Sequence, residues 1–330
     1  MICEETGVLN EFDISVIIPV YNTGKFLGEC IDSILNQTKD NIEVVIVNDG
    51  STDESASIIE RYATNHANIR AITQKNSGVE KARAVGYQHA RGRYIGWVDA
   101  DDIAKPEMFE KLYSLALKEN ADFVYCDYEF FPQKVATKSK WFKEYKGVID
   151  GYFIDRNTQC WNTLVRRDLY EKVHIDELLA EFTEYCWIAA MIAAEKIAYT
   201  NEELYCYRVG HNSMSGGEYV GRVEYYKKGV RITKNLKKMI MGTPYEELLD
   251  SYFDYRYIYT LLLLMLVAAK NSDRQTYEET REELRRMNYR SNPYLDRFVA
   301  NNFGKLKALV ITRIVPSCYV IANSLVKAAL

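Results

Sequence analysis

Short apolar runs alternate with amphipathic segments along the first 130 residues, and this alternation predicts the elements. The predicted strands are 14–20 (ISVIIPV), 42–47 (IEVVIV), 69–73, 94–98 and 123–128. The first two are rich in β-branched residues, as in strands buried on both faces of a parallel sheet. Apolar positions at helical spacing predict helices around 26–35, 58–62, 82–90 and 106–119. The β-α-β-α-β order indicates a doubly wound α/β sheet, in which ligands bind beyond the carboxyl ends of the strands.

The second half of the chain has a different pattern. Residues 132–160 are mixed, and after about residue 217 the chain has the character of long helices. The longest predominantly apolar run, 257–269, has 13 residues, fewer than the roughly 20 that a spanning helix needs. We therefore expect an N-terminal extension (1–12), an α/β domain (13–216) and a helical C-terminal region (217–330), with no integral membrane segment.

Composition narrows the class of protein. A charged content of 27% with a net charge of −4 is typical of a globular protein and provides no overall attraction to nucleic acid, which we exclude as a partner. The seven cysteines include no CxxC pair, which argues against a disulfide framework or a zinc site and is typical of a reducing cytoplasm. The 26 tyrosines fit either a packed core or a sugar-binding surface.

The strongest chemical signal is the sequence WVDADD at 97–102, directly after a predicted buried strand. The carboxylates of Asp99, Asp101 and Asp102 repel one another unless a cation or hydrogen-bond donors offset them. Asp-x-Asp suits Mg²⁺ or Mn²⁺, hard cations that take oxygen ligands and bridge diphosphates. Alone, the motif is equally consistent with a solvated turn that caps the helix at Pro106.

Two weaker polar clusters follow other strands. DGSTD at 49–53 ends the second strand, where a carboxylate can accept hydrogen bonds from a base or a ribose, although Asp-Gly-Ser is also common in turns. QKNSG at 74–78 precedes Lys81 and Arg83 and offers amide and guanidinium groups to a nucleotide, although a plain loop is the simpler interpretation.

In their order and spacing, the segments 14–21, 44–53, 74–86 and 93–102 together resemble glycosyltransferase family 2. The resemblance covers roughly residues 13–210. It implies a GT-A (Rossmann-like) fold with a nucleotide-binding half (13–105) and an acceptor half (106–216). It further implies a hexosyltransferase that moves a sugar from a UDP-sugar, with inversion and with Mn²⁺ or Mg²⁺, to a glycan or a lipid-linked acceptor.

Specific roles follow from the same resemblance. The positions that match the family's nucleotide-sugar contacts are Pro19, Val20, Tyr21, Asp49, Asn76, Arg83, Asp99 and Ala100. Asp49 would hold the edge of the uracil ring. Asp101 would be the direct metal ligand, with Asp99 and His211 as candidate further ligands. The family often has Arg-Asn where this chain has Arg83-Ala84.

The predicted catalytic base departs from the family's pattern. Relatives usually carry Glu-Asp at the start of a helix, and the aspartate deprotonates the attacking hydroxyl. Here the sequence is EFTEYCW (181–187), and an ungapped count places Glu184 in the aspartate's position. Glutamate keeps the carboxylate, so Glu184 is the predicted general base and Glu181 the reserve.

Two basic segments suggest contact with anionic lipid. Residues 305–330 carry four basic residues and no acid among many aliphatics, and 222–238 carries seven basic residues and one acid. Ordinary helices that dock on the core are the alternative. By analogy with the family we expect a bacterial-type cytoplasmic enzyme at the inner face of the cell membrane, in surface-polysaccharide synthesis. The sugar, the acceptor and the oligomeric state are not specified by these residues.

Two other functions compete with this prediction. A nucleotidyltransferase would carry a glycine-rich basic loop after the first strand, which PVYNTG (19–24) lacks. A non-catalytic relative that binds a nucleotide sugar as the partner of another transferase is favoured by the missing Glu-Asp pair. The intact Asp99-Ala100-Asp101 argues against that relative.

Overall fold

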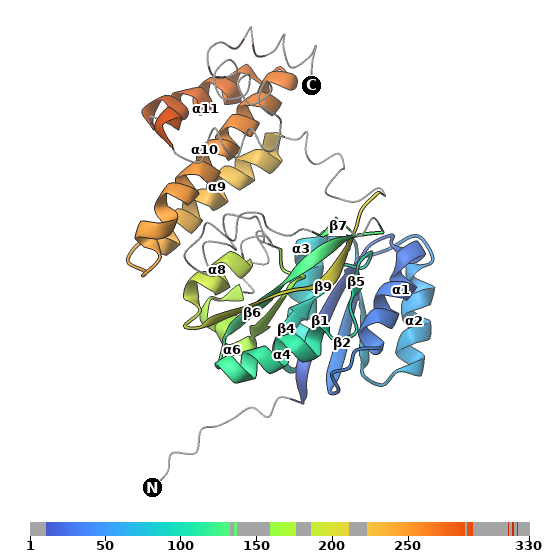
Figure 1. Cartoon of the computed structure of the whole chain (residues 1–330). Coiled ribbons are helices and arrows are strands. Elements are labelled where there is room, and N and C mark those ends of the chain that lie inside the picture. Colours follow the sequence, from blue (N-terminus) through green and yellow to red (C-terminus); the bar gives the residue numbers. More distant parts are fainter. Residues whose placement is uncertain are drawn as a thin grey trace. The chain divides into compact units, whose positions relative to one another are not determined.

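A computed structural model describes residues 11–132, 135–136, 159–175, 186–210, 223–287 and 289–292, together with 316, 319 and 322. The chain divides into two compact units, Met1–His211 and Asn212–Leu330. The first unit is an α/β sandwich around one sheet, and the second is helical (Figure 1).

The described strands of the first unit form one mixed sheet in the order β3-β2-β1-β4-β8-β6-β9-β5, with β7 paired to β6. The strands are β1 (Phe12–Val20), β2 (Ile42–Asn48), β3 (Ile69–Thr73), β4 (Gly92–Trp97), β5 (Ile103–Ala104), β6 (Phe123–Phe131), β7 (Val135–Ala136), β8 (Thr163–Arg166) and β9 (Ile197–Arg208). The helices are α1 (Gly24–Leu35), α2 (Ser55–Asn65), α3 (Val79–His89), α4 (Met108–Glu119), α6 (Arg167–Lys172) and α8 (Cys186–Ala193).

The first half of the sheet agrees with the prediction from the sequence. β3, β2, β1 and β4 are parallel neighbours, and every residue of β2 is buried, as its β-branched run requires. The second half is mixed rather than uniformly parallel. β8 lies antiparallel between β4 and β6, and β9 runs parallel to β6 and antiparallel to β5.

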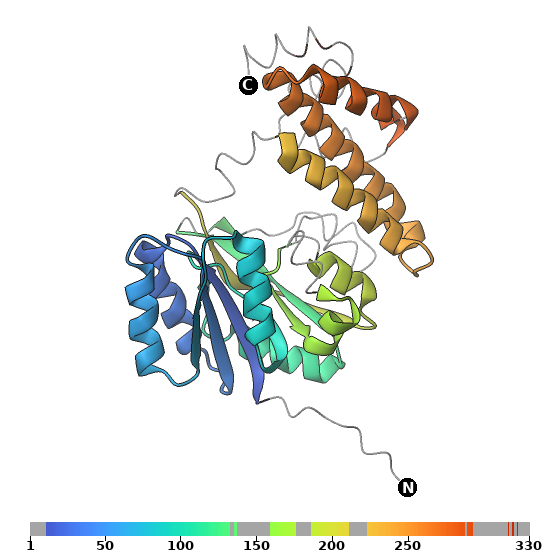
Figure 2. The same ribbon diagram turned by 180° about the vertical axis from the view of Figure 1, so that it is seen from behind.

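Helices cover both faces of the sheet, with α3 on one face and α4 on the other (Figures 1 and 2). α3 lies very close to the sheet, because a Cβ atom on its Gly86 would lie 2.4 Å from Cγ2 of Ile17. Only glycine allows this approach. The close packing holds Arg83, one helical turn earlier, against the sheet.

A buried carboxylate connects β1, β2 and the start of β4 at the edge opposite the polar loops. The side chain of Glu43 is fully buried. Its Oε1 accepts hydrogen bonds from the Ser15 hydroxyl (2.5 Å) and the Arg91 backbone N–H, and its Oε2 accepts one from Arg91 Nε (3.2 Å). A buried charge held in this way becomes costly once its partners are removed.

We expect Glu43→Ala to lower the free energy of unfolding by about 3 kcal/mol, because it leaves the buried Ser15 hydroxyl without its acceptor and Arg91 without its buried charged partner. Urea unfolding measures the change. Glu11→Ala is the matched control, since Glu11 contacts the same arginine but its side chain is 56% exposed. It should change stability by less than about 1 kcal/mol, and equal effects of the two substitutions would contradict the prediction.

The second unit contains α9 (Val223–Ile240), α10 (Glu246–Lys270), α11 (Arg274–Arg286) and the short 3₁₀ helix η4 (Tyr289–Ser291). α10 packs against both α9 and α11. Within the described residues, one segment of α10, Leu249–Lys270, is long and apolar enough to cross a membrane by length and composition, and 67% of its most apolar window is buried. Core helices of soluble proteins also pass this test.

Part of the positive charge of residues 222–238, for which contact with anionic lipid is predicted, is paired with acidic side chains within the second unit. Lys234 pairs with Glu283 of α11 at 2.8 Å, and Lys237 contacts Asp250 at 3.2 Å and also Asp254, both on α10. These pairs reduce the positive charge available to anionic lipid. Of residues 305–330, only 316, 319 and 322 are described, so this second basic segment lies almost wholly outside the described residues.

Candidate active site

The carboxyl ends of β1, β2 and β4 bring most of the predicted site residues to one edge of the sheet. β1 ends at Val20, which is opposite Asn48 of β2, and the Asp49 N–H donates to the Val20 carbonyl at 2.8 Å. Beyond β1 lies Tyr21, whose ring is unusually open to solvent at 48% exposed. An exposed aromatic ring at this edge is available for stacking against a flat ligand.

The loops after β1 and β2 are joined through side-chain hydrogen bonds. Asp53 accepts hydrogen bonds from the first N–H groups of two helices, Gly24 of α1 (2.9 Å) and Ser55 of α2 (3.0 Å). The Asn22 side chain accepts from the Thr52 N–H at 2.8 Å and so links the two loops directly. One carboxylate at two positive helix ends fixes the position of both loops.

Asp49 organises the loop that precedes α3. Its Oδ1 accepts from Gln74 Nε2 (2.7 Å) and the Ser77 N–H (2.9 Å), and its Oδ2 accepts from the Gly78 N–H (2.8 Å). The neighbouring Gly50 has φ +71°, and a Cβ atom there would lie 2.7 Å from the backbone N of Asn76. The turn after β2 therefore requires glycine, and it presents the exposed Asn76 at the edge of the site.

The family resemblance implies that this edge binds UDP, and on that hypothesis we expect Asp49→Asn to weaken UDP binding about tenfold, because the amide cannot accept all three hydrogen bonds and the loop 74–78 loosens. Isothermal titration with UDP measures the change. Asp122→Asn is the matched control, since Asp122 is also buried and accepts from the N–H groups of Glu195 and Lys196, but at the opposite edge of the sheet. Equal losses of UDP affinity in both variants would contradict the prediction.

Arg83 and Asp99, both predicted donor-binding residues, form an ion pair. Nη2 of Arg83 lies 2.6 Å from Oδ1 of Asp99, and the guanidinium lies over the ring of Trp187, 5.7 Å from its centre. Arg83 is 8% exposed, whereas the Asp99 side chain is 29% exposed and faces the edge of the site. The structure therefore places a fixed positive charge beside the carboxylates after β4.

The three carboxylates after β4 have different environments. Asp102 is 1% exposed, and burial raises its pKa well above the usual range, with further increases from Asp99 and Asp101. Burial also raises the pKa of Asp99, Arg83 opposes this shift, and Asp101 adds to it. Burial is thus the main cause of both pKa shifts, and repulsion among the carboxylates adds to them; a bound cation would oppose both effects.

The donor set fits a hard divalent ion. Asp99 and Asp101 are both partly exposed at the same strand end and provide carboxylate oxygens, which Mg²⁺ and Mn²⁺ prefer. Asp102 is different, because each of its oxygens accepts a hydrogen bond from β9. Within the described ranges no three His, Cys, Asp or Glu side chains are grouped so as to hold a metal alone. A bound ion would therefore need further ligands, such as phosphate oxygens.

Three predicted residues lie outside the described residues: Glu184, Glu181 and His211. Their roles as base, reserve base and candidate metal ligand remain predictions.

Residues of β9 complete the site, and their contacts with it could not be inferred from the sequence. Tyr205 and Arg208 hydrogen-bond to the turn formed by residues 99–102. Trp161 stacks on Tyr205 with ring centres 4.4 Å apart. The only advance signal was the recurrence of tyrosine and arginine in YCYR (205–208), because the contacts join residues about a hundred positions apart.

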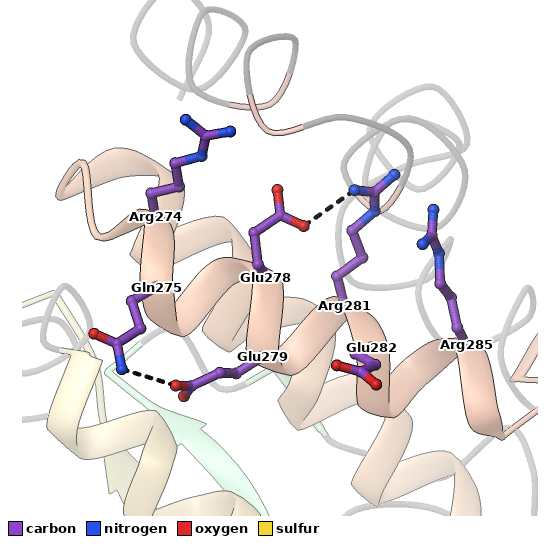
Figure 3. Close-up of a pocket in the computed structure, with 7 residues that line it drawn as sticks. All are labelled: Arg274, Gln275, Glu278, Glu279, Arg281, Glu282 and Arg285. Atoms are coloured by element: carbon purple, nitrogen blue, oxygen red, sulfur yellow. Dashed lines mark hydrogen bonds and ion pairs between the residues drawn. The ribbon is translucent and has the colours of Figure 1, made fainter.

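A hollow on α11 in the second unit has no comparable chemistry. Its lining is Arg274, Gln275, Glu278, Glu279, Arg281, Glu282 and Arg285 (Figure 3). Side chains one turn apart interact along the helix. Arg281 pairs with Glu278 at 3.1 Å, and Gln275 donates a hydrogen bond to Glu279 at 2.9 Å. This surface is a solvated, charge-balanced helix face, and the candidate active site is the sheet edge of the first unit.

Comparison with known proteins supports the same region. The profile of Glycosyl transferase family 2 matches residues 15–174. The chain is 36% identical over 219 residues to the uncharacterized glycosyltransferase EpsJ of Bacillus subtilis, covering 61% of this chain and 62% of EpsJ. It is 31% identical over 224 residues to the glycosyltransferase GlyG of Streptococcus pneumoniae, covering 62% of this chain and 74% of GlyG.

The chain belongs to glycosyltransferase family 2. A solved structure of S. aureus TarS (residues 1–349) in complex with UDP-GlcNAc matches this family 2 chain with a TM-score of 0.65 at 18% identity, over 93% of this chain and 91% of that one. The predicted family and the predicted GT-A fold with a helical C-terminal region are thus confirmed. The match to EpsJ spans less than two thirds of that protein's length.

Proposed function

We propose that this chain is a glycosyltransferase that moves a hexose from a UDP-sugar to a hydroxyl group of a glycan or a lipid-linked acceptor. The observation that carries the proposal is the turn Asp99–Asp102 at the carboxyl end of β4, beside the buried Arg83 and the loop held by Asp49. Membership in family 2 supports sugar transfer as the chemistry, and TarS, which has the same fold, binds UDP-GlcNAc.

The donor would lie across the ends of β1, β2 and β4. Tyr21 and Asn76 are exposed at this edge and can contact the base, with the half-buried Pro19 beside them, whereas Val20 and Asp49 are almost fully buried. Three of the four hydrogen bonds that the Asp49 carboxylate can accept are already used within the protein. Asp49 therefore acts mainly by holding the loop 74–78 in place, with one remaining position for the ring edge of uracil.

Asp101, with Asp99, would hold Mn²⁺ or Mg²⁺ at the diphosphate, and His211 is a further candidate ligand. When bound, the ion would neutralise the charge that develops on the leaving UDP. Arg83 adds a preorganised positive charge that needs no rearrangement during the reaction. Asp99 can exchange part of its contact with Arg83 for the ribose or for the ion, because its side chain is partly exposed.

Glu184 would take the proton of the acceptor hydroxyl as that oxygen attacks the anomeric carbon. A single displacement of this kind inverts the anomeric centre. Glutamate is one methylene longer than the family's aspartate, and Glu181 is the reserve position.

The rival function is a non-catalytic relative that binds a nucleotide sugar as the partner of another transferase. It is favoured only by the Glu-for-Asp difference at Glu184. The intact Asp99-Ala100-Asp101 favours the enzyme, because a metal ion held there would serve departure of the diphosphate, which binding alone does not need.

Release of UDP from a panel of UDP-sugars, with Mn²⁺ or Mg²⁺ and then with EDTA, tests the function. Slow hydrolysis of one donor, dependent on the metal and accelerated by membrane extract that contains acceptors, is the expected result. Binding of a UDP-sugar without turnover under every condition would favour the non-catalytic relative. Acceleration by the lipid fraction of the extract rather than the glycan fraction would support a lipid-linked acceptor and work at the inner face of the cell membrane.

A further inference from the structure

The turn that carries Asp99 and Asp101 is supported by β9 as well as by β4. Directly after Asp102, the two-residue strand β5 pairs with β9, with Ile103 opposite Cys206 and Ala104 opposite Tyr205. β9 therefore lies against the carboxylate turn. Two of its side chains reach into this turn.

Tyr205 joins the two ends of the turn through one oxygen atom. Its hydroxyl donates to Oδ2 of Asp102 at 2.7 Å and accepts from the Asp99 N–H at 3.2 Å. The side chain is fully buried and stacked on Trp161, so the hydroxyl has a fixed position. A hydroxyl that both donates and accepts is the side-chain group suited to this bridge.

Arg208 holds the middle of the turn. Its Nε donates to the Asp101 carbonyl at 2.6 Å, and its backbone N–H donates to Oδ1 of Asp102 at 2.7 Å. The guanidinium lies between the rings of Phe26 and Phe131, 4.7 Å from each centre, and pairs with Glu29 at 2.6 Å. This packing fixes the Asp101 carbonyl and thereby the main chain from which the Asp101 side chain projects.

We propose that Tyr205 and Arg208 are positioning residues that set the affinity of the Asp99–Asp101 turn for its divalent ion. They touch neither the ion nor the sugar, and they act by holding the turn in the geometry that the ligands require. Groups that orient ligands in this way change metal affinity by about 10- to 100-fold. The inference rests on the proposed function, because it assumes that the turn binds a metal with UDP.

Mn²⁺ binding in the presence of UDP, followed by the EPR signal of free Mn²⁺, tests the inference without requiring turnover. Tyr205→Phe removes only the hydroxyl, and Arg208→Lys keeps the charge but loses the planar donor that bonds the Asp101 carbonyl. Each variant should raise the dissociation constant for Mn²⁺ about tenfold. In the donor assay, saturating Mn²⁺ should restore most of the turnover, as expected of residues that act through the ion.

The matched controls lie in the same unit but away from the turn. Tyr199→Phe removes a β9 hydroxyl that donates to Asp127 at 2.9 Å, and Arg166→Lys alters an arginine that pairs with Asp122 at 2.6 Å. Both should leave Mn²⁺ affinity within twofold of the wild type. If wild type binds Mn²⁺ with UDP but the variants of Tyr205 and Arg208 bind it equally well, the inference is wrong and the proposed function stands. If wild type binds no Mn²⁺ with UDP, the metal part of the proposed function fails, and the inference fails with it.

Discussion

Asp101→Asn should reduce the rate of sugar transfer by about 10²- to 10³-fold, because it removes an anionic oxygen from the turn that would hold the divalent ion at the diphosphate. Asparagine has nearly the same size, so the packing of the turn against β9 should persist. The main-chain carbonyl of residue 101 still accepts from Arg208. The loss should therefore appear in turnover and Mn²⁺ affinity and not in stability.

Asp13→Asn is the matched control for this substitution. Asp13 lies at the start of β1, at the opposite edge of the sheet, where it pairs with Lys39 at 2.6 Å. Asp13→Asn removes one negative charge from the same unit, as Asp101→Asn does. UDP release and Mn²⁺ binding by both variants, with thermal unfolding as a check on folding, separate the roles. If Asp101→Asn keeps full metal-dependent turnover, the assignment of Asp101 as the metal ligand is wrong.

Glu184→Gln should reduce acceptor-dependent transfer by about 10²- to 10⁴-fold, the usual contribution of a general base. Glutamine cannot accept the hydroxyl proton at neutral pH. Binding of UDP and slow hydrolysis of the donor without acceptor should remain, because Asp49, Arg83 and Asp101 are unchanged. The comparison needs both assays, UDP release with acceptor and UDP release without it.

The reserve position gives this experiment its control. Glu181→Gln makes the same chemical change three residues earlier, so it should retain most of the acceptor-dependent turnover. The opposite pattern, in which Glu181→Gln is inactive and Glu184→Gln active, would move the base to Glu181. Normal activity of both single variants would show that neither carboxylate is the base. The non-catalytic function would gain support only if the wild type also failed to transfer.

The two classes of substitution test different parts of the reaction. Asp101→Asn affects the leaving group and should impair donor hydrolysis as well as transfer. Glu184→Gln affects the nucleophile and should spare donor hydrolysis. A chain in which both substitutions have the same effect in both assays would not use the single-displacement mechanism proposed for it.

Local pattern was sufficient for the nucleotide-binding half of the fold. Continuous β-branched runs predict β1 and β2, because burial on both faces of a parallel sheet permits few polar residues. Apolar residues at helical spacing predict α1, α3 and α4. The clusters at Asp49, Arg83 and Asp99 could also be placed at one edge of the sheet. Parallel strands joined by right-handed helical connections bring their carboxyl ends together.

Tertiary structure decided how these residues are held. Most of the contacts join segments that are 16 or more positions apart in the sequence. They are the ion pair of Arg83 with Asp99, the three hydrogen bonds of Asp49 and the bond from Gly24 to Asp53. The bond from Ser55 to Asp53 is local but depends on the conformation of the loop. The residue types alone could not show which donor pairs with which carboxylate, because several carboxylates of the chain could accept from each donor.

The support of the carboxylate turn by β9 was least accessible from the sequence. Tyr205 and Arg208 reach Asp99, Asp101 and Asp102 across more than a hundred residues, through a mixed sheet in which β8 is antiparallel. The sequence by itself thus determined the family, the parallel strands and the chemical groups at their ends. Only the folded chain decided which of the three carboxylates in this turn is buried and which two stay partly exposed, because that depends on long-range packing rather than on local preference.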